Sequence, residues 1–161
     1  RAIGQIVGPS DWIPASDRLE GARRALAEHQ MQPNPDYIVN CPAWSFQCGY
    51  DAARHLLTTS PEITALFCHS DSMATGAYRA LRELNLRVPD DVSVIGYDDL
   101  PICQYLDPPL ASVRQPSQGL GQLLAQLVVT AIECKEFSSQ EMLVPATLVV
   151  RSSVSAAIPV R

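Results

Sequence analysis

Short apolar runs alternate along the chain with stretches in which apolar residues recur every three or four positions. The runs are Ile3–Gly8, Tyr37–Cys41, Ile63–Cys68 and Val92–Tyr97. Runs of this length are typical of strands that helices cover, and spacings of three and four are typical of amphipathic helices. The pattern therefore predicts four strands separated by helices.

The predicted helices have recognisable ends. The first begins after a cap at Ser16-Asp17, the second runs from Phe46 to about Thr59, and the third is capped by Ser70 or Asp71. Pro61 supports the end of the second helix, because proline disfavours the helical conformation in the residue before it. Strands that alternate with helices predict an α/β fold, a doubly wound parallel sheet with right-handed crossovers.

The alternation breaks after Asp99. A loop with three prolines is expected over residues 100–109, followed by a short strand at Leu110–Val113, a helix from about Ser117, a strand at Leu143–Val150 and a tail from Ser152. A long irregular excursion of this kind indicates a chain that crosses to a neighbouring lobe and returns. We therefore expect part of the protein to lie outside this sequence.

Composition and charge argue against two classes of function, membrane insertion and direct nucleic-acid binding. With 161 residues, 47% of them hydrophobic and 18% charged, the chain is expected to form one domain with a substantial core. No apolar run approaches the roughly 18 residues of a membrane span, so we expect no membrane partner. The net charge is −5, and the longest basic cluster is Arg23-Arg24. Direct binding to nucleic acid is disfavoured, since phosphates require a concentrated basic surface.

The five cysteines form no C-x-x-C pair. Most lie in or beside predicted strands and helices, where reduced cysteine acts as a small apolar residue, so we favour structural thiols over metal or redox chemistry. A reducing, cytoplasmic location follows. The three histidines (His29, His55 and His69) have no metal-ligand spacing, and no metal or cofactor is expected.

Polar and aromatic residues follow the predicted strands. In open parallel sheets, ligands bind beyond the carboxyl ends of the strands. The residues at these ends include Trp12, Trp44, Ser70, Asp71 and Asp98. Carboxylates accept hydrogen bonds from hydroxyl groups, and indole rings cover the apolar face of a sugar or base. Arg18, on the first predicted helix, can donate two coplanar hydrogen bonds from its guanidinium to ring or hydroxyl oxygens of a ligand. This chemistry indicates a polyol or nucleoside-like site.

Structural alternatives exist for the residues at the strand ends. Asp98 can cap a turn or pair with a surface arginine, Trp44 can pack at a rim, and Trp12 can be an exposed loop residue. Ser70-Asp71 can be a helix cap alone. For His69, a hydrogen-bonded structural role is favoured over that of a catalytic base.

Catalytic patterns are missing from the sequence. There is no G-x-S-x-G elbow, no phosphate-binding glycine loop, and no nucleophile coupled to a base. Binding is therefore favoured over catalysis, and the chain is not expected to be an enzyme. An enzyme of an unrecognised α/β class remains a competing hypothesis, which turnover of a sugar or nucleoside would support.

Three motifs carry a family resemblance: SDSMATGA, VPDDVSVIGYDD and PPLASVRQP. With IGQIVGP, RLEGARRAL and Cys48-Gly49-Tyr50 upstream, nearly the whole chain resembles the lactose/galactose repressor family. The resemblance implies a type I periplasmic-binding-protein-like fold, of which this chain is mostly the C-terminal lobe. Residues 1–113 would form that lobe without its first strand and helix, which would leave Ile3–Val7 at a sheet edge. Residues 114–141 would belong to the N-terminal lobe, and residues 142–161 would return and end in a tail.

The resemblance also implies roles for particular residues. Arg18 and Asp98 match effector-contacting positions, and Trp44 lies where some members place an aromatic ring against the ligand. Ser70 stands where many members have asparagine, a departure that argues against a lactose-like effector. Gln115 lies at the expected hinge between the lobes, within reach of ligand. Members form dimers, here expected through surfaces near Phe46–Tyr50, Ala74–Leu81 and Ile102–Tyr105.

The leading hypothesis is therefore the effector-binding and dimerisation region of a bacterial transcriptional repressor. Its partners would be a small sugar or nucleoside-like effector, a second copy of the chain, and operator DNA through a headpiece that this sequence does not contain. The alternative is the ligand-binding lobe of a transport-type sugar-binding protein. The effector itself stays open.

Overall fold

The computed structural model describes residues 2–134 and 142–156. The strands are β1 (Ala2–Val7), β2 (Ile38–Asn40), β3 (Ile63–Cys68), β4 (Ser93–Tyr97), β5 (Ala111–Arg114) and β6 (Thr147–Val149). The helices are α1 (Ile13–Glu28), α2 (Phe46–Thr59), α3 (Asp71–Glu83) and α4 (Ser117–Cys134). Two 3₁₀ turns, η1 (Pro35–Tyr37) and η2 (Pro101–Gln104), lie in the loops.

The six strands form one sheet in the order β2-β1-β3-β4-β5-β6. Neighbouring strands from β2 to β5 are parallel, and β6 is antiparallel to β5. The predicted doubly wound α/β fold is therefore confirmed. The expectation that Ile3–Val7 forms an edge is wrong, because β1 pairs with β2 on one side and β3 on the other.

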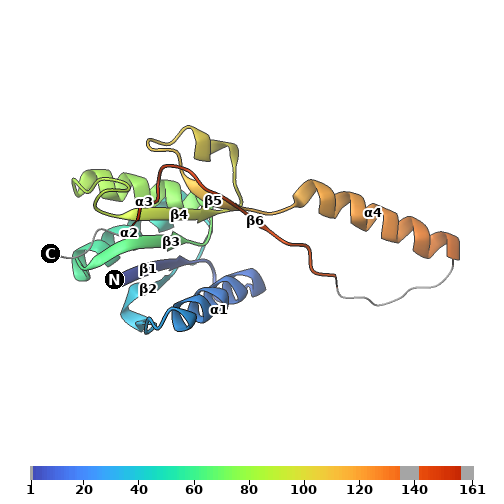
Figure 1. Ribbon diagram of the computed structural model, residues 1–161, viewed down its shortest axis with the longest axis horizontal. Helices are drawn as coiled ribbons and strands as arrows, with labels where there is room; N and C mark the ends of the chain where they lie inside the picture. Colours follow the sequence, from blue (N-terminus) through green and yellow to red (C-terminus); the bar gives the residue numbers. More distant parts are fainter. Residues whose placement is uncertain (1, 135–141, 157–161) are drawn as a thin grey trace.

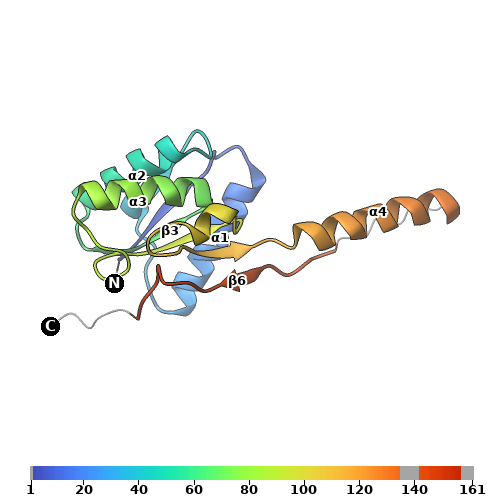
Figure 2. The ribbon, with the colours of Figure 1, turned by 90° about the horizontal axis from the view of Figure 1, so that it is seen from above.

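Helices cover the two faces of the sheet unequally. Helices α2 and α3 lie side by side on one face, and α1 lies on the other (Figure 2). Beneath α2 and α3 the side chains of Leu56, Leu66, Met73 and Leu81 are fully buried. In α1 only Ala15 is buried. The main core of the molecule thus lies between the sheet and the α2–α3 pair.

Helix α1 begins earlier than the sequence pattern predicts. Its cap is Trp12 rather than Ser16-Asp17, and Pro14 occupies its first turn. Proline is favourable there, since the first helical N–H groups have no acceptor within the helix and the fixed φ of proline matches the helix. The early start makes Trp12, in the connection that follows β1, the residue directly before the helix.

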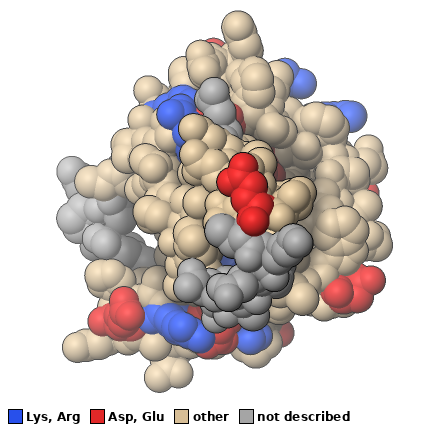
Figure 3. Space-filling view, turned by 90° about the vertical axis from the view of Figure 1, so that its right-hand side faces the viewer, with Lys and Arg blue, Asp and Glu red and all other residues tan. Residues whose placement is uncertain are grey.

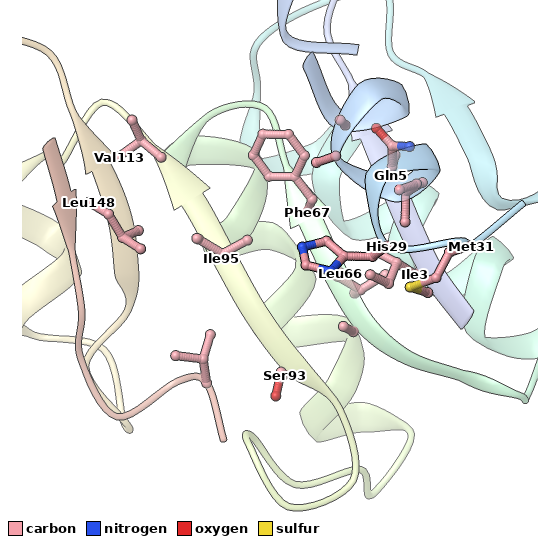
Figure 4. A pocket seen from close by; sticks show the side chains of 15 residues that line it. Ile3, Gln5, His29, Met31, Leu66, Phe67, Ser93, Ile95, Val113 and Leu148 are labelled. Atoms are coloured by element: carbon pink, nitrogen blue, oxygen red, sulfur yellow. The ribbon is translucent and has the colours of Figure 1, made fainter. Parts of the chain in front are cut away.

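An apolar groove lies on the α1 face, between α1 and β6 (Figure 4). Its volume is about 480 Å³. Its lining includes Phe67 from β3, Ile95 from β4, Val113 from β5 and Leu148 from β6. The described residues thus leave part of this face of the sheet without a covering helix.

Helix α4 projects away from the sheet (Figure 1). Leu124, Val128 and Ile132 expose 53%, 57% and 71% of their surface. None of the helices in the described part of the chain combines the length and apolarity of a membrane span. The exposed apolar side chains of α4 are therefore surfaces that this chain by itself does not bury.

The chain that returns from α4 is anchored in the sheet. The strand predicted at Leu143–Val150 is limited to β6. Beyond it, Ser153 is fully buried: its Oγ donates to Val94 O at 2.6 Å and accepts from Ala111 N at 2.7 Å. The prediction of a tail from Ser152 onward is therefore wrong for Ser153, because the side chain of Ser153 forms hydrogen bonds with both β4 and β5.

Candidate ligand-binding site

Six residues gather at the carboxyl ends of the parallel strands, and we call them the strand-end cluster: Trp12, Arg18, Trp44, Tyr97, Asp98 and Gln115. Arg18, from the second turn of α1, is at the centre. Its guanidinium carbon is 3.8 Å from the Tyr97 ring centroid and 5.3 Å from the Trp44 ring centroid. One guanidinium nitrogen lies 3.7 Å from Asp98 Oδ1, and another donates to the backbone carbonyl of His69. The arginine is held between aromatic faces and a carboxylate.

Trp44 lies beside this arginine, and Trp12 packs on Trp44. Their ring centroids are 6.4 Å apart in an edge-to-face arrangement. Trp12 is 54% exposed, whereas Trp44 packs partly against the core. Gly8 makes room for Trp44, because a Cβ at that position would lie 2.2 Å from the indole ring. Trp44 is therefore a fixed wall of the cluster, and Trp12 is its exposed rim.

Asp98 stands at the end of β4 with its backbone φ at 109°. Its Oδ1 accepts a hydrogen bond from Gln115 Nε2 at 2.7 Å. Burial raises the pKa of this carboxyl, and the Gln115 hydrogen bond and the charge of Arg18 oppose the rise. The structure thus brings Asp98 together with Arg18 and Gln115, two other residues predicted for the site.

The adjacent Asp99 faces the other way. Its carboxylate accepts from Arg114 Nε and from Arg151 Nη2, each at 2.6 Å. Burial raises the pKa of Asp99, but these hydrogen bonds outweigh it and hold the pKa below its ordinary value. Arg114 ends β5 and Arg151 follows β6, so Asp99 ties together the two passages of chain that lead to and from α4.

Ser70 and Asp71 lie behind the cluster rather than in it. Ser70 is buried and caps α3, accepting a hydrogen bond from Met73 N. Asp71 is fully buried, and its two carboxylate oxygens accept from Ser112 Oγ and Leu100 N. Both residues were predicted as ligand contacts, and the structure gives their side-chain oxygens internal partners instead.

His69 is fully buried below Arg18. Neither ring nitrogen has a hydrogen-bond partner among the described residues, so the interpretation as a hydrogen-bonded histidine is wrong. The ring packs against Phe67, with centroids 4.5 Å apart. Burial, and then the charge of Arg18, lower the pKa of His69 from 6.5 to about 4. The imidazole is therefore neutral at physiological pH.

This histidine predicts a pH dependence of stability. The unfolded chain takes up a proton near the ordinary pKa of 6.5, but the folded chain does so only near 4. The free energy of unfolding should therefore fall as pH falls through this window and level off below it, by at most about 3 kcal/mol. Urea unfolding of the His69→Phe variant between pH 7 and pH 4 should show a shallower fall than the unaltered chain.

The control for this series is His55→Gln, a change at an exposed histidine of α2. Asp98, with its raised pKa, contributes with the opposite sign in part of the same window, and the comparison of variants removes its contribution. Equal pH slopes for the unaltered chain and His69→Phe would contradict the prediction.

Sequence patterns located most of the cluster but missed Tyr97 as a member. Its ring stacks on the Arg18 guanidinium, closer than that of Trp44. The residue lies next to Asp98 at the end of β4, which was the available signal. The orientation of its ring depends on the position of α1, which spacing along the chain does not reveal.

The chemistry of the cluster is that of binding. Among the described residues no group of histidine, cysteine and carboxylate side chains is arranged to hold a metal ion. Burial raises the pKa of the Cys41 and Cys103 thiols to about 12, so both stay protonated at neutral pH. The apolar groove of Figure 4 offers almost no polar partner, and no residue of the strand-end cluster lines it. A hydroxyl-rich ligand therefore fits the cluster better than the groove.

Seen from the side toward which α4 projects, the surface is mainly uncharged (Figure 3). Acidic and basic side chains are scattered over this visible face, and its blue side chains form no continuous patch. This face therefore resembles neither a basic nucleic-acid-binding surface nor a single strongly charged docking site.

The chain is similar in sequence to proteins of a known family. Residues 1–154 match the family model described as a periplasmic binding protein-like domain. The ribose operon repressor of Haemophilus influenzae is 37% identical over 154 residues, which are 96% of this chain and 46% of the repressor. The chain thus spans about half the length of the curated relatives that it matches.

Two solved structures are similar in sequence and in fold. The complex of the transcriptional regulator CelR with cellobiose is 35% identical, with a TM-score of 0.89, over 95% of this chain and 46% of that one. A LacI family transcriptional regulator from Enterococcus faecium with bound ribose is 32% identical, with a TM-score of 0.80, over 94% and 56% of the two chains.

Proposed function

Because the chain belongs to the periplasmic binding protein-like domain family, in the group of LacI family regulators, we propose that it is the effector-binding region of a bacterial transcriptional repressor. Its effector would be a sugar or a nucleoside-like molecule. Effector binding at the strand-end cluster would change the affinity of the complete protein for its operator. By complete protein we mean one that joins this chain to the remaining half present in its relatives.

The observation that carries this proposal is the arrangement of Arg18, Asp98 and Trp44. The guanidinium and the carboxylate lie 3.7 Å apart and can donate to and accept from neighbouring hydroxyl groups. The indole of Trp44, fixed beside them, offers an apolar face of the kind that packs on a sugar ring. We propose Trp12 and Gln115 as further contacts, at the rim and at the chain crossover.

We also propose a division of the chain between two lobes. Residues 1–113 would belong to the C-terminal lobe, residues 114–141 to the N-terminal lobe, and residues 142–161 would return to the first. Two features support this division: the exposed apolar side chains of α4, and the Asp99 contacts that hold both passages at the crossover. The apolar groove on the α1 face would receive the further helix of the C-terminal lobe that this sequence lacks.

The complete protein would work as a cytoplasmic homodimer that binds operator DNA through a separate headpiece. The exposed Phe46, Ile102 and Tyr105 support a dimer surface on this chain, since they expose 55%, 37% and 81% of their area. A transport-type sugar-binding protein is disfavoured, because the similar proteins are named as repressors and regulators. A binding role without catalysis is part of the same proposal.

A thermal-shift screen of the complete protein tests this function. The panel would contain D-ribose, D-galactose, cellobiose and adenosine. A ligand at about 100 times its Kd should add roughly 2.7 kcal/mol to the unfolding free energy and raise the melting temperature by several degrees. Turnover of a panel member, or no shift with any of them, would contradict the proposal.

A further inference from the structure

The backbone directly after β4 has an uncommon conformation. Asp98 and Asp99 both have positive φ, at 109° and 54°. Positive φ is uncommon for residues other than glycine and costs about 1–3 kcal/mol where the conformation is sparsely populated. Two such residues in succession persist only if neighbouring groups hold them in place. This conformation also turns the two carboxylates apart, Asp98 toward Arg18 and Asp99 toward Arg114 and Arg151.

The backbone N–H groups of the two residues after Asp98 donate hydrogen bonds to one buried network. Asp99 N donates to Ser112 Oγ at 3.1 Å, and Leu100 N donates to Asp71 Oδ2 at 2.7 Å. Ser112 Oγ in turn donates to Asp71 Oδ1 at 2.6 Å. Asp71 therefore receives the hydrogen bond of Leu100 directly and is linked to that of Asp99 through one hydroxyl.

This network is enclosed and tightly fitted. Asp71 and Ser112 have no exposed surface. The carboxylate of Asp71 occupies space left by Gly96 on β4, where a Cβ would lie 2.2 Å from Oδ1. A buried carboxyl group with a hydrogen bond on each oxygen keeps a defined orientation, because losing either partner would leave a buried oxygen without a hydrogen bond. The Asp71 side chain, at the start of α3, is thus held in one fixed position.

We infer that Asp71, through Ser112 and the backbone of residues 99 and 100, is the positioning residue that aims the Asp98 carboxylate at the ligand. Asp71 itself does not touch the ligand. This inference rests on the proposed function and deepens it, since it separates the carboxylate that binds from the carboxylate that orients. It replaces the expectation that Asp71 is a ligand contact.

A double-mutant cycle in the complete protein tests the inference. The single variants are Asp71→Asn and Asp98→Ala. The measurement is the calorimetric Kd for the member of the thermal-shift panel (D-ribose, D-galactose, cellobiose or adenosine) that binds the unaltered protein most tightly. Asp71→Asn should weaken binding about tenfold, within the 2- to 150-fold range for coupled neighbours. In the Asp98→Ala background the same change should alter Kd less than about twofold.

A purely structural role for Asp71 predicts a different outcome. Damage to the fold would weaken binding by the same factor with or without Asp98, and additive losses would overturn the inference while leaving the proposed function intact. If the unaltered protein binds no member of this panel, both the inference and the proposed function are overturned.

Ser112→Ala can take the place of Asp71→Asn in the double-mutant cycle if the Asp71→Asn variant does not fold. It removes the hydroxyl link to Asp99 N but keeps the Leu100 hydrogen bond to Asp71. Ser112→Ala should also weaken binding severalfold, and again only while Asp98 is present. Unchanged Kd in Ser112→Ala would overturn the inference.

Discussion

The Asp98→Ala variant of the complete protein should bind its effector about 10- to 150-fold more weakly than the unaltered protein. A hydrogen bond to a charged group contributes about 1.5–3 kcal/mol, and each 1.4 kcal/mol is a factor of ten. Asp98 is the strand-end carboxylate that a ligand hydroxyl can share with Arg18. Calorimetric titration with the panel member that gives the largest thermal shift would measure the loss.

Asp51→Ala is the matched control for this variant. Asp51 is an exposed aspartate of α2 that accepts a hydrogen bond from Gln47, much as Asp98 accepts one from Gln115. Its removal should leave the Kd unchanged. If Asp98→Ala binds as tightly as Asp51→Ala, then Asp98 does not contact the effector.

The Gly76→Ala variant should lose about 1–3 kcal/mol of stability through overpacking between α2 and α3. A Cβ on Gly76 would lie 2.0 Å from the Phe46 carbonyl oxygen and 2.7 Å from Tyr50 N, both backbone atoms that no side-chain movement can relieve. Gly49 has the same role from the other helix, with Met73 O at 2.1 Å. The two helices would have to separate, and the melting temperature should fall by about 2–12 °C.

Gly21→Ala serves as the control, because a Cβ on this exposed glycine of α1 would meet no atom within 4 Å. It should stabilise the chain by about 0.5–1 kcal/mol, since alanine is a better helix former than glycine. Circular dichroism melts of both variants would measure the two shifts. Equal effects of the two substitutions would show that α2 and α3 do not pack at their glycines.

The parallel part of the fold was predictable because its strands are buried. Ile63–Cys68 carries an almost continuous apolar run, and β3 has these same bounds in the structure. Non-local pairing was less accessible to prediction. The place of β1 inside the sheet depends on β2 pairing beyond it, and the anchoring role of Ser153 depends on contacts with Val94 and Ala111, far away in the sequence.

The candidate site was predictable in outline for a related reason. Parallel strands end at one edge of the sheet, so Trp12, Trp44 and Asp98 could be assigned to a common place. The sequence could not distinguish a carboxylate that faces the ligand from one that is buried beside it. Asp71 and Asp98 both follow strands, and only the partners Ser112 and Leu100 show that Asp71 points into the protein.

The most direct test of the proposed site is a crystal structure of the complete protein with the sugar or nucleoside that shifts its melting temperature most. We predict ligand oxygens within hydrogen-bond distance of the Asp98 carboxylate and the Arg18 guanidinium, with the Trp44 indole against the ligand. A ligand bound elsewhere, such as in the apolar groove between α1 and β6, with the strand-end cluster untouched, would contradict the account.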